Sequence, residues 1–223
     1  MRNAECGIRT AALLLLVCGL FSAVSVSSAG ESPAGPSQDA IIQTIEGHYR
    51  DLGDLTARVV QKNLLSSVGK TQTFEGTLLM KKPGRLRIDY TNGQVIVLDG
   101  KNALLYSKKG QQAVKRTFTD IAQANVPVSF LLGAADIRNE FEVVERVSGA
   151  VRHTLDLTPK RKDAAMKKIE LVCDETGRIT AMAVYDRSGN TAELAFLDVR
   201  ENTGLEDARF VFAIPKGTEI IEQ

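Results

Sequence analysis

Strict alternation of polar and apolar residues is the feature that most constrains the fold of this chain. It is clearest in the segment RLRIDY, which places Arg85, Arg87 and Asp89 on one side and Leu86, Ile88 and Tyr90 on the other. A repeat of two residues predicts a strand with one wet face and one dry face. The dry face has to be covered, either by another layer of protein or by something that binds and leaves.

Similar alternation recurs along most of the chain, and turn pairs such as Asn92-Gly93 and Ser148-Gly149 separate the segments. We expect strands near residues 55–65, 72–81, 85–91, 94–99, 102–107, 111–116, 140–147, 151–158, 166–173, 178–185, 190–200 and 209–214. Consecutive strands joined by tight turns predict a mainly β (α+β) fold: an antiparallel sheet of about 11–12 strands that curls into a barrel or half-barrel.

Two segments have helical periodicity instead. Residues 38–50 carry Ile41, Ile42, Ile45 and Tyr49 at helical spacing, and Pro127–Gly133 reads as a short helix between a proline and a glycine. These few turns are too short to cover a dozen strands completely. A curled sheet of this size that is only partly covered leaves room for an apolar binding cavity, as barrels above the smallest size do.

The first 29 residues have the three-part layout of a cleavable signal peptide. Arg2 and Arg9 precede an apolar run from Ala11 to Val26, and small residues lead to a cleavage site after Ala29. A membrane anchor and a lipoprotein signal ending at Cys18 are the weaker alternatives, since the run is short for a span and Val17 is bulky. We expect a flexible linker at residues 30–37 and a single exported domain at residues 38–223.

The overall charge gives no case for nucleic-acid binding, because the formal net charge is +1. One local cluster is basic, namely Lys160-Arg161-Lys162 with Lys167-Lys168. It is either a docking patch for an acidic partner or, as we favour, the solvated tip of a long hairpin.

Catalysis has little support in the sequence. His48 and His153 lie far apart and no group of residues has metal-ligand spacing, so both are expected to be structural. Cys173 lies on an alternating segment and is expected to be a buried hydrophobe rather than a nucleophile. With no nucleophile elbow, phosphate loop or dinucleotide motif, we expect no enzyme activity, no cofactor and no metal site.

The order of several short motifs resembles the LolA family of periplasmic lipoprotein carriers. The resemblance runs from about Ile41 to Ile221 and is carried by Val59-Val60-Gln61-Lys62, Phe74-x-Gly76-x-Leu78, Lys81-Lys82-Pro83-x-x-x-Arg87, Ile96-Val97-Leu98-Asp99-Gly100-Lys101, Leu105-Tyr106, Pro127-x-x-Phe130-Leu131-Leu132, Leu155-x-Leu157-x-Pro159 and the stretch Phe210–Ile220. Each motif is weak alone, and their joint order behind a signal peptide is more specific.

The resemblance implies a periplasmic chaperone that carries acylated lipoproteins from the inner to the outer membrane. Its implied partners are an inner-membrane lipoprotein-releasing ABC transporter and an outer-membrane receptor or the outer membrane itself. The implied apolar cavity is lined by Leu86, Ile88, Tyr90, Leu105, Leu155, Leu157 and Phe196, and the implied lid residues are Ile45, Phe130 and Leu131.

The resemblance also implies a latch. In the family an arginine before the proline holds the lid through hydrogen bonds to helical backbone, and here that position is Lys82. A lysine is a point donor where arginine offers a planar fork, so the latch is expected to be weaker, or not used. Two other functions fit the same fold: a lipoprotein- or lipid-sensing envelope regulator, and a periplasmic glycolipid carrier.

Overall fold

The structure is a computed structural model that describes residues 36–117, 130–132, 136–148, 151–162, 164 and 166–222. The expected signal peptide and most of the expected linker lie outside these residues. So does most of the expected helix at Pro127–Gly133, of which Phe130 and Leu131 are described and are helical.

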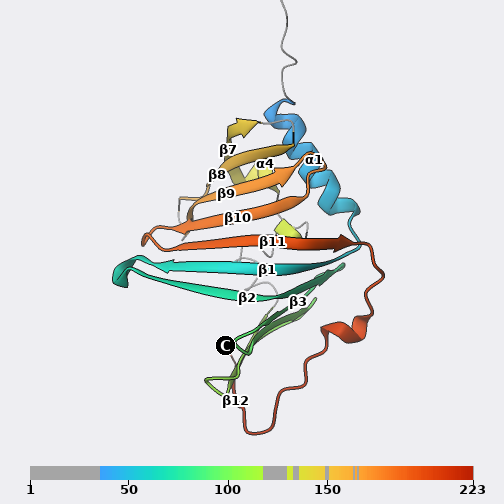
Figure 1. The fold of residues 1–223 in the computed structure, drawn as a ribbon, viewed down its shortest axis with the longest axis vertical. Coiled ribbons are helices and arrows are strands. Elements are labelled where there is room, and N and C mark those ends of the chain that lie inside the picture. Colours follow the sequence, from blue (N-terminus) through green and yellow to red (C-terminus); the bar gives the residue numbers. More distant parts are fainter. Residues whose placement is uncertain are drawn as a thin grey trace, which may run out of the picture. The chain divides into compact units, whose positions relative to one another are not determined.

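Twelve strands form one sheet (Figure 1). They are β1 (Asp54–Leu65), β2 (Lys70–Lys81), β3 (Arg85–Tyr90), β4 (Gln94–Asp99), β5 (Asn102–Ser107), β6 (Gln112–Thr117), β7 (Phe141–Ser148), β8 (Arg152–Pro159), β9 (Met166–Asp174), β10 (Ile179–Asp186), β11 (Thr191–Glu201) and β12 (Glu219–Glu222). Their order across the sheet is β12-β6-β5-β4-β3-β2-β1-β11-β10-β9-β8-β7.

The sheet consists of two meanders that meet where β1 pairs with β11. All neighbours are antiparallel except β12, which runs parallel to β6. Because β7 and β12 are the outermost strands, the sheet does not close in the part of the chain that the structure describes. The expectation of an incomplete, mainly antiparallel barrel is confirmed.

Alternation in the sequence becomes alternation in burial. In β3 every second residue is buried, and Leu86, Ile88 and Tyr90 are 0–9% exposed. On the neighbouring β2, Gly76 lies so close to β3 that an added Cβ would come 2.5 Å from the carbonyl oxygen of Asp89. A glycine is therefore needed at this crossing of the two strands.

Besides the helical Phe130 and Leu131, the described residues contain two α-helices. These are α1 (Gln38–Asp51), close to the expected 38–50, and the short α4 (Ile137–Glu140), which the sequence pattern did not predict. Ser37 caps α1, since its side chain accepts a hydrogen bond from the backbone N–H of Ala40. None of the described helices is long and apolar enough to span a bilayer.

The expected strand at residues 209–214 is wrong. Asp207–Phe210 is a turn of 3-10 helix, the following residues run on without strand pairing, and the last strand is instead β12. The alternation there is nevertheless real, because Phe210 is buried and Phe212 and Ile214 are half-buried between exposed neighbours. Every second side chain of this segment packs on the sheet beneath it. The alternation therefore does not come from hydrogen bonds to a neighbouring strand.

The two faces of the sheet are covered differently. The inner face, which carries Leu86, Ile88 and Tyr90, packs with α1 and Phe130–Leu132 in one large hydrophobic core. We call α1 and Phe130–Leu132 the inner cover. We call residues 203–218 the outer cover. Its 3-10 turn, Asp207–Phe210, contacts β3 and β4, the Phe212 ring contacts that of Tyr106 on β5, and Phe210 is its most buried side chain.

Candidate functional site

The inner face brings together the residues that the sequence singled out for a cavity. Strand registers place Leu86 opposite Leu98, Leu157 opposite Ile169, and Phe196 opposite Val59, and directly opposed residues share a face. Of the seven wall residues, six belong to one core with Ile45, Phe130 and Leu131 of the inner cover, namely Leu86, Ile88, Tyr90, Leu155, Leu157 and Phe196. The seventh, Leu105, is half-buried and packs against that core.

The inner face is largely aliphatic, and its few polar atoms are satisfied. The Tyr90 hydroxyl donates to Gln61 Oε1 at 2.5 Å, and burial raises the pKa of Tyr90 to about 12, so the hydroxyl stays neutral. Phe74 meets the Tyr90 ring edge-on at 6.1 Å. Such a surface attracts hydrocarbon of almost any shape and offers no group that would react with it.

In this structure the predicted wall residues of the inner face share one hydrophobic core with the inner cover. Ile41, Ile42, Ile45 and Tyr49 of α1 are 2–3% exposed, and six of the seven predicted wall residues that they join are 0–9% exposed. A ligand that used the inner face would have to displace the inner cover. The candidate site is therefore an apolar surface, the inner face, whose apolar partner, the inner cover, a ligand could replace.

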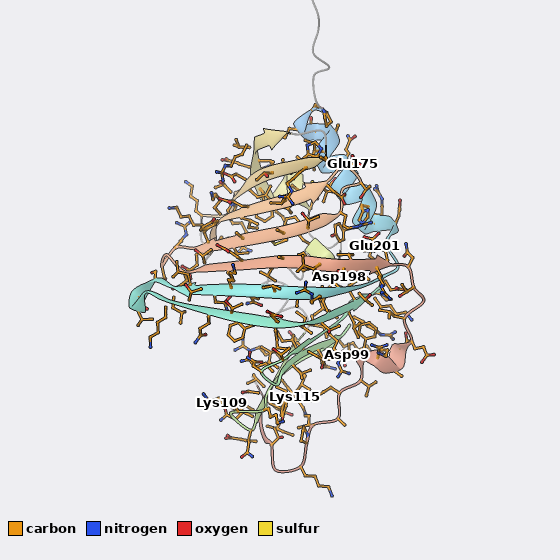
Figure 2. All side chains as sticks on the ribbon, viewed as in Figure 1. Asp99, Lys109, Lys115, Glu175, Asp198 and Glu201 are labelled. Atoms are coloured by element: carbon orange, nitrogen blue, oxygen red, sulfur yellow. The ribbon has the colours of Figure 1, made fainter. Side chains whose placement is uncertain are left out.

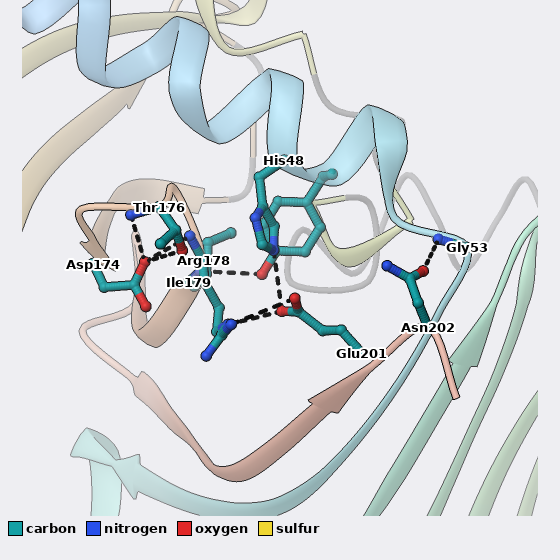
Figure 3. Close-up of polar contacts among 9 residues, drawn as sticks. His48, Gly53, Asp174, Thr176, Arg178, Ile179, Glu201 and Asn202 are labelled. Atoms are coloured by element: carbon teal, nitrogen blue, oxygen red, sulfur yellow. Dashed lines mark hydrogen bonds and ion pairs between the residues drawn. The ribbon is translucent and has the colours of Figure 1, made fainter. Parts of the chain in front are cut away.

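Polar contacts connect α1 to β10 and β11 (Figure 3). The backbone N–H of Ile179 donates to the Tyr49 hydroxyl at 3.1 Å, and burial raises the pKa of that hydroxyl. His48 Nε2 lies 3.1 Å from Glu201 Oε1, which also accepts from Arg178 Nε at 2.8 Å. These contacts fix the rotation of the helix, so that its isoleucines point into the core.

A close backbone approach fixes the height of α1 above the turn between β9 and β10. A Cβ added to Gly177 would lie 2.5 Å from the Thr44 carbonyl oxygen, and Gly177 has a positive φ of 83°. Only glycine allows both the turn and the contact. At the other side of α1, Arg138 Nη1 lies 3.5 Å from the Asp39 carboxylate and ties α4 to the first turn.

Lys82 lies at the C-terminal end of α1. Its ammonium donates to the backbone carbonyls of Tyr49 and, at 3.0 Å, of Arg50. Burial lowers the pKa of Lys82, and Asp51 nearby opposes that shift. Carbonyls at a helix C-terminus lack partners within the helix and carry partial negative charge, so a cation is well placed there.

The neighbouring Lys81 points to the opposite side of the sheet. Its ammonium donates to the Leu205 carbonyl and to Asp207, both at 2.6 Å, and both acceptors belong to the outer cover. Two successive lysines on an extended segment thus hold the two covers separately. That only one of the two lysines reaches the inner cover agrees with the alternation, and a role of Lys82 in cargo handling stays a prediction.

The sequence missed Asp54, which begins β1 directly after α1. This carboxylate is 6% exposed and accepts hydrogen bonds from the backbone N–H groups of Thr203, Gly204 and Leu205 at 2.8–3.1 Å. Its partners lie about 150 positions away in the chain, so no local pattern could have indicated them. The polar contacts of Arg178 with Glu201 and of Tyr49 with Ile179 were missed for the same reason.

Both histidines and Cys173 lie within helices and strands of the described part of the chain. The described residues contain no group of three or more His, Cys, Asp or Glu side chains that could hold a metal ion. His48 lies at the contact of α1 with β11, and His153 is buried in β8. Cys173 is fully buried in β9, as expected for a small core residue.

Comparisons with known proteins agree on one family. The model of the family described as outer membrane lipoprotein carrier protein LolA matches residues 50–213. An outer-membrane lipoprotein carrier protein of Cupriavidus taiwanensis is 28% identical over 95% of this chain and 98% of its own length, and one of Cupriavidus pinatubonensis is 30% identical over 83% and 87%.

Among solved structures, an uncharacterized conserved protein from Thermus thermophilus shares the fold with a TM-score of 0.53 and 14% identity. The match covers 84% of this chain and all of that one. The family match spans most of the sheet and the end of α1. The chain therefore belongs to the LolA family of outer membrane lipoprotein carrier proteins.

Proposed function

We propose that this protein is a periplasmic carrier that binds the acyl chains of lipoproteins against the inner face of its sheet and transports them from the inner to the outer membrane. The observation that carries the proposal is the pairing of a large aliphatic face with a cover that is itself mainly aliphatic. The names of the relatives point to the same cargo.

The energetics fit a shuttle. Each methylene removed from water gains about 0.8 kcal/mol, so an acyl chain of roughly fifteen methylenes needs on the order of 12 kcal/mol of shielding to cross an aqueous space. When cargo displaces the inner cover, acyl chains bury the same wall that α1 buried. When cargo leaves, α1 and Phe130–Leu132 bury it again, so the empty wall is never left in water.

The partners follow from this cycle. Loading requires a donor that lifts the lipoprotein from the inner membrane, for which we propose a lipoprotein-releasing ABC transporter. Unloading requires an acceptor, which is an outer-membrane receptor or the outer membrane itself. Because binding is apolar and non-covalent, the proposed cycle needs no catalytic residue in this chain.

Fluorescence quenching tests the proposal directly, because the chain contains no tryptophan. We would introduce one at Phe196→Trp, on the inner face, and in a matched control at Val211→Trp, which is 70% exposed on the outer cover. Both proteins are purified after export, in the form processed by the cell. A triacylated lipopeptide with brominated acyl chains is then added.

We expect the brominated chains to quench the tryptophan at position 196 and to leave that at position 211 unaffected. Quenching at neither position, or equal quenching at both, would overturn the proposal. Mass spectrometry of material that co-purifies identifies the class of cargo. A glycolipid in place of a lipoprotein would favour the glycolipid carrier.

A further inference from the structure

Three hairpin turns lie side by side at one end of the sheet. They connect β1 to β2, β10 to β11, and β8 to β9. The registers place Leu64 opposite Thr191, Thr191 opposite Tyr185, and Asp186 opposite Met166, so the three turns are neighbours. The first two turns project on the same side of the sheet in Figure 1.

Hydrogen bonds between the turns join them into one surface. The backbone N–H of Ser66 donates to Asn190 Oδ1 and its hydroxyl donates to the Ser188 carbonyl, both at 3.0 Å. Arg187 donates to the carbonyls of Ala164 at 2.8 Å and Lys162 at 3.1 Å. We call the described residues of segments 62–70, 160–167 and 186–193 the turn surface.

The turn surface is strongly basic in a chain that is nearly neutral. Its three segments contain seven basic residues, and the sequence has three acidic ones there, whereas the whole chain has 28 and 27. The basic residues are all exposed: Lys62, Lys70, Lys160, Arg161, Lys162, Lys167 and Arg187. A local excess of this kind attracts a negatively charged partner.

Exposed apolar side chains lie among these charges. Leu64, Leu65 and Val68 at the first turn are 38%, 39% and 60% exposed, and they are three of the eight large apolar residues exposed in the described part of the chain. Two of the basic residues, Lys62 and Lys70, flank them in the sequence. Neither solvation of a hairpin tip nor attraction to acidic side chains requires apolar residues at this place.

We propose that the turn surface docks on a membrane that contains anionic lipid. Basic side chains near such a membrane are attracted to its surface charge, and apolar side chains beside them enter the boundary between headgroups and acyl chains. An acidic protein would match the charges but would not account for three exposed apolar residues at a protruding turn. The proposal differs from the expectation of a merely solvated hairpin tip, because it gives the exposed apolar residues a binding role.

Membrane docking is separate from the proposed carrier function, because it does not require an acyl chain bound to the inner face. It is therefore tested with cargo-free protein, purified after export and processed by the cell. Its failure would leave the quenching result at position 196 untouched. We would measure co-sedimentation with vesicles of equal parts phosphatidylglycerol and phosphatidylethanolamine, and with vesicles of phosphatidylcholine alone.

Charge variants show whether the turn surface makes the contact. We expect binding to the anionic vesicles only, and about a 25-fold loss of partitioning for Lys70→Glu, since each charge near the membrane contributes about fivefold and the reversal changes two. The matched control is Lys109→Glu in the turn between β5 and β6, which makes the same charge change elsewhere (Figure 2). No binding to anionic vesicles, or an equal loss in the control, would overturn the proposal.

A tryptophan reporter then separates lipid from protein as the partner. With anionic vesicles we expect the emission of Val68→Trp to shift to shorter wavelength, and that of Val211→Trp to stay unchanged. Retention on immobilised polyglutamate that depends on Lys70, without any vesicle binding, would show that the turn surface recognises an acidic protein and would overturn the lipid proposal.

Discussion

The two covers of the sheet are held by different forces. The inner cover is held mainly by four side chains of α1 that are buried in the large core. One of its polar contacts, from the Ile179 N–H to the Tyr49 hydroxyl, is buried as well, and those of His48 and Lys82 lie at its margins. The outer cover has one deeply buried side chain, Phe210, and is held by directed contacts to Asp54, Lys81 and Arg87. An acyl chain can replace the first kind of contact but not the second, because it offers neither donors nor acceptors.

The outer cover is therefore the fixed one. Arg87 Nη1 donates to the carbonyls of Arg209 and Val211, both at 3.1 Å, and the guanidinium lies 5.8 Å from the centre of the Phe212 ring. Hydrogen bonds from Lys81 and Arg85 hold the pKa of Asp207 below its ordinary value. If only the inner cover is displaced by ligand, binding should change how much inner-cover residues contribute to the free energy of unfolding. The contribution of outer-cover residues should stay the same.

The largest effect is expected from truncating one buried side chain in each cover. Phe210→Ala and Ile45→Ala should each lower the free energy of unfolding of the cargo-free protein by about 3 kcal/mol, because both leave a cavity. With a saturating acylated lipopeptide, the loss should persist for Phe210→Ala. It should shrink for Ile45→Ala, since Ile45 no longer contacts the wall when cargo has displaced α1.

Urea unfolding with and without the lipopeptide measures both differences. Unaltered slopes with urea would show that the variants change stability rather than the compactness of either state. A loss for Ile45→Ala that is the same with and without lipopeptide would mean that α1 is not displaced.

A smaller effect is expected at Asp54, where the outer cover meets the start of β1. Burial raises the pKa of this carboxyl, but hydrogen bonds from Thr203, Leu205 and Gly204 outweigh it and the pKa lies below its ordinary value. Asp54→Asn keeps the shape and loses the charge. It should lower the free energy of unfolding by about 2 kcal/mol at neutral pH, as hydrogen bonds to a charged group are lost.

The pH dependence of that loss has a definite sign. Because the folded-state pKa is depressed, the stabilisation is complete above the unfolded-state pKa of about 3.9 and disappears as the pH falls through the lower folded-state value. The melting temperatures of the two proteins should therefore differ at pH 7 and converge in acid. A constant difference at all pH values would show that the Asp54 charge is not what matters.

The alternation of residues predicted most of the sheet. Eleven of the twelve expected strands lie within about two residues of their predicted bounds, since side-chain burial along a strand repeats every two residues. The same rule failed at residues 209–214, where alternate burial of Phe210 and Phe212 comes from lying on the outer face rather than from pairing. A repeat of two residues shows that alternate side chains are buried on one face of a segment. Whether that segment is a strand depends on hydrogen bonds to a neighbouring strand.

The alternation of residues predicted the candidate site only in its apolar part, and the position of Lys82 came from the family resemblance instead. Residues such as Leu155 and Leu157 follow the alternation, and the registers place them on the face that the pattern indicated. Their contact with cargo remains a prediction. Polar contacts such as Asp54 with Thr203, or Tyr49 with Ile179, join segments more than a hundred residues apart, which a local pattern cannot indicate.

The smallest effect is expected at Lys82, which joins the sheet to the end of the inner cover. Lys82→Leu removes hydrogen bonds to the carbonyls of Tyr49 and Arg50. Because the ammonium is partly exposed to solvent, we expect a loss of about 1 kcal/mol in the closed state, less than the usual range for a charged donor. Cargo competes with the closed state for the same wall. Weakening the closed state should therefore raise the affinity for an acylated lipopeptide about fivefold and slow its release to outer-membrane vesicles by a similar factor.

Two further variants decide whether the effect comes from this contact. Lys82→Arg keeps a charged donor at the end of α1 and should restore release, whereas Lys81→Leu loosens the outer cover and should leave release unchanged while lowering stability. Release rates are measured by transfer of a fluorescent lipopeptide. Normal release by Lys82→Leu would show that α1 is held by its apolar face alone, and the polar contact at its end would then position the helix without governing its movement.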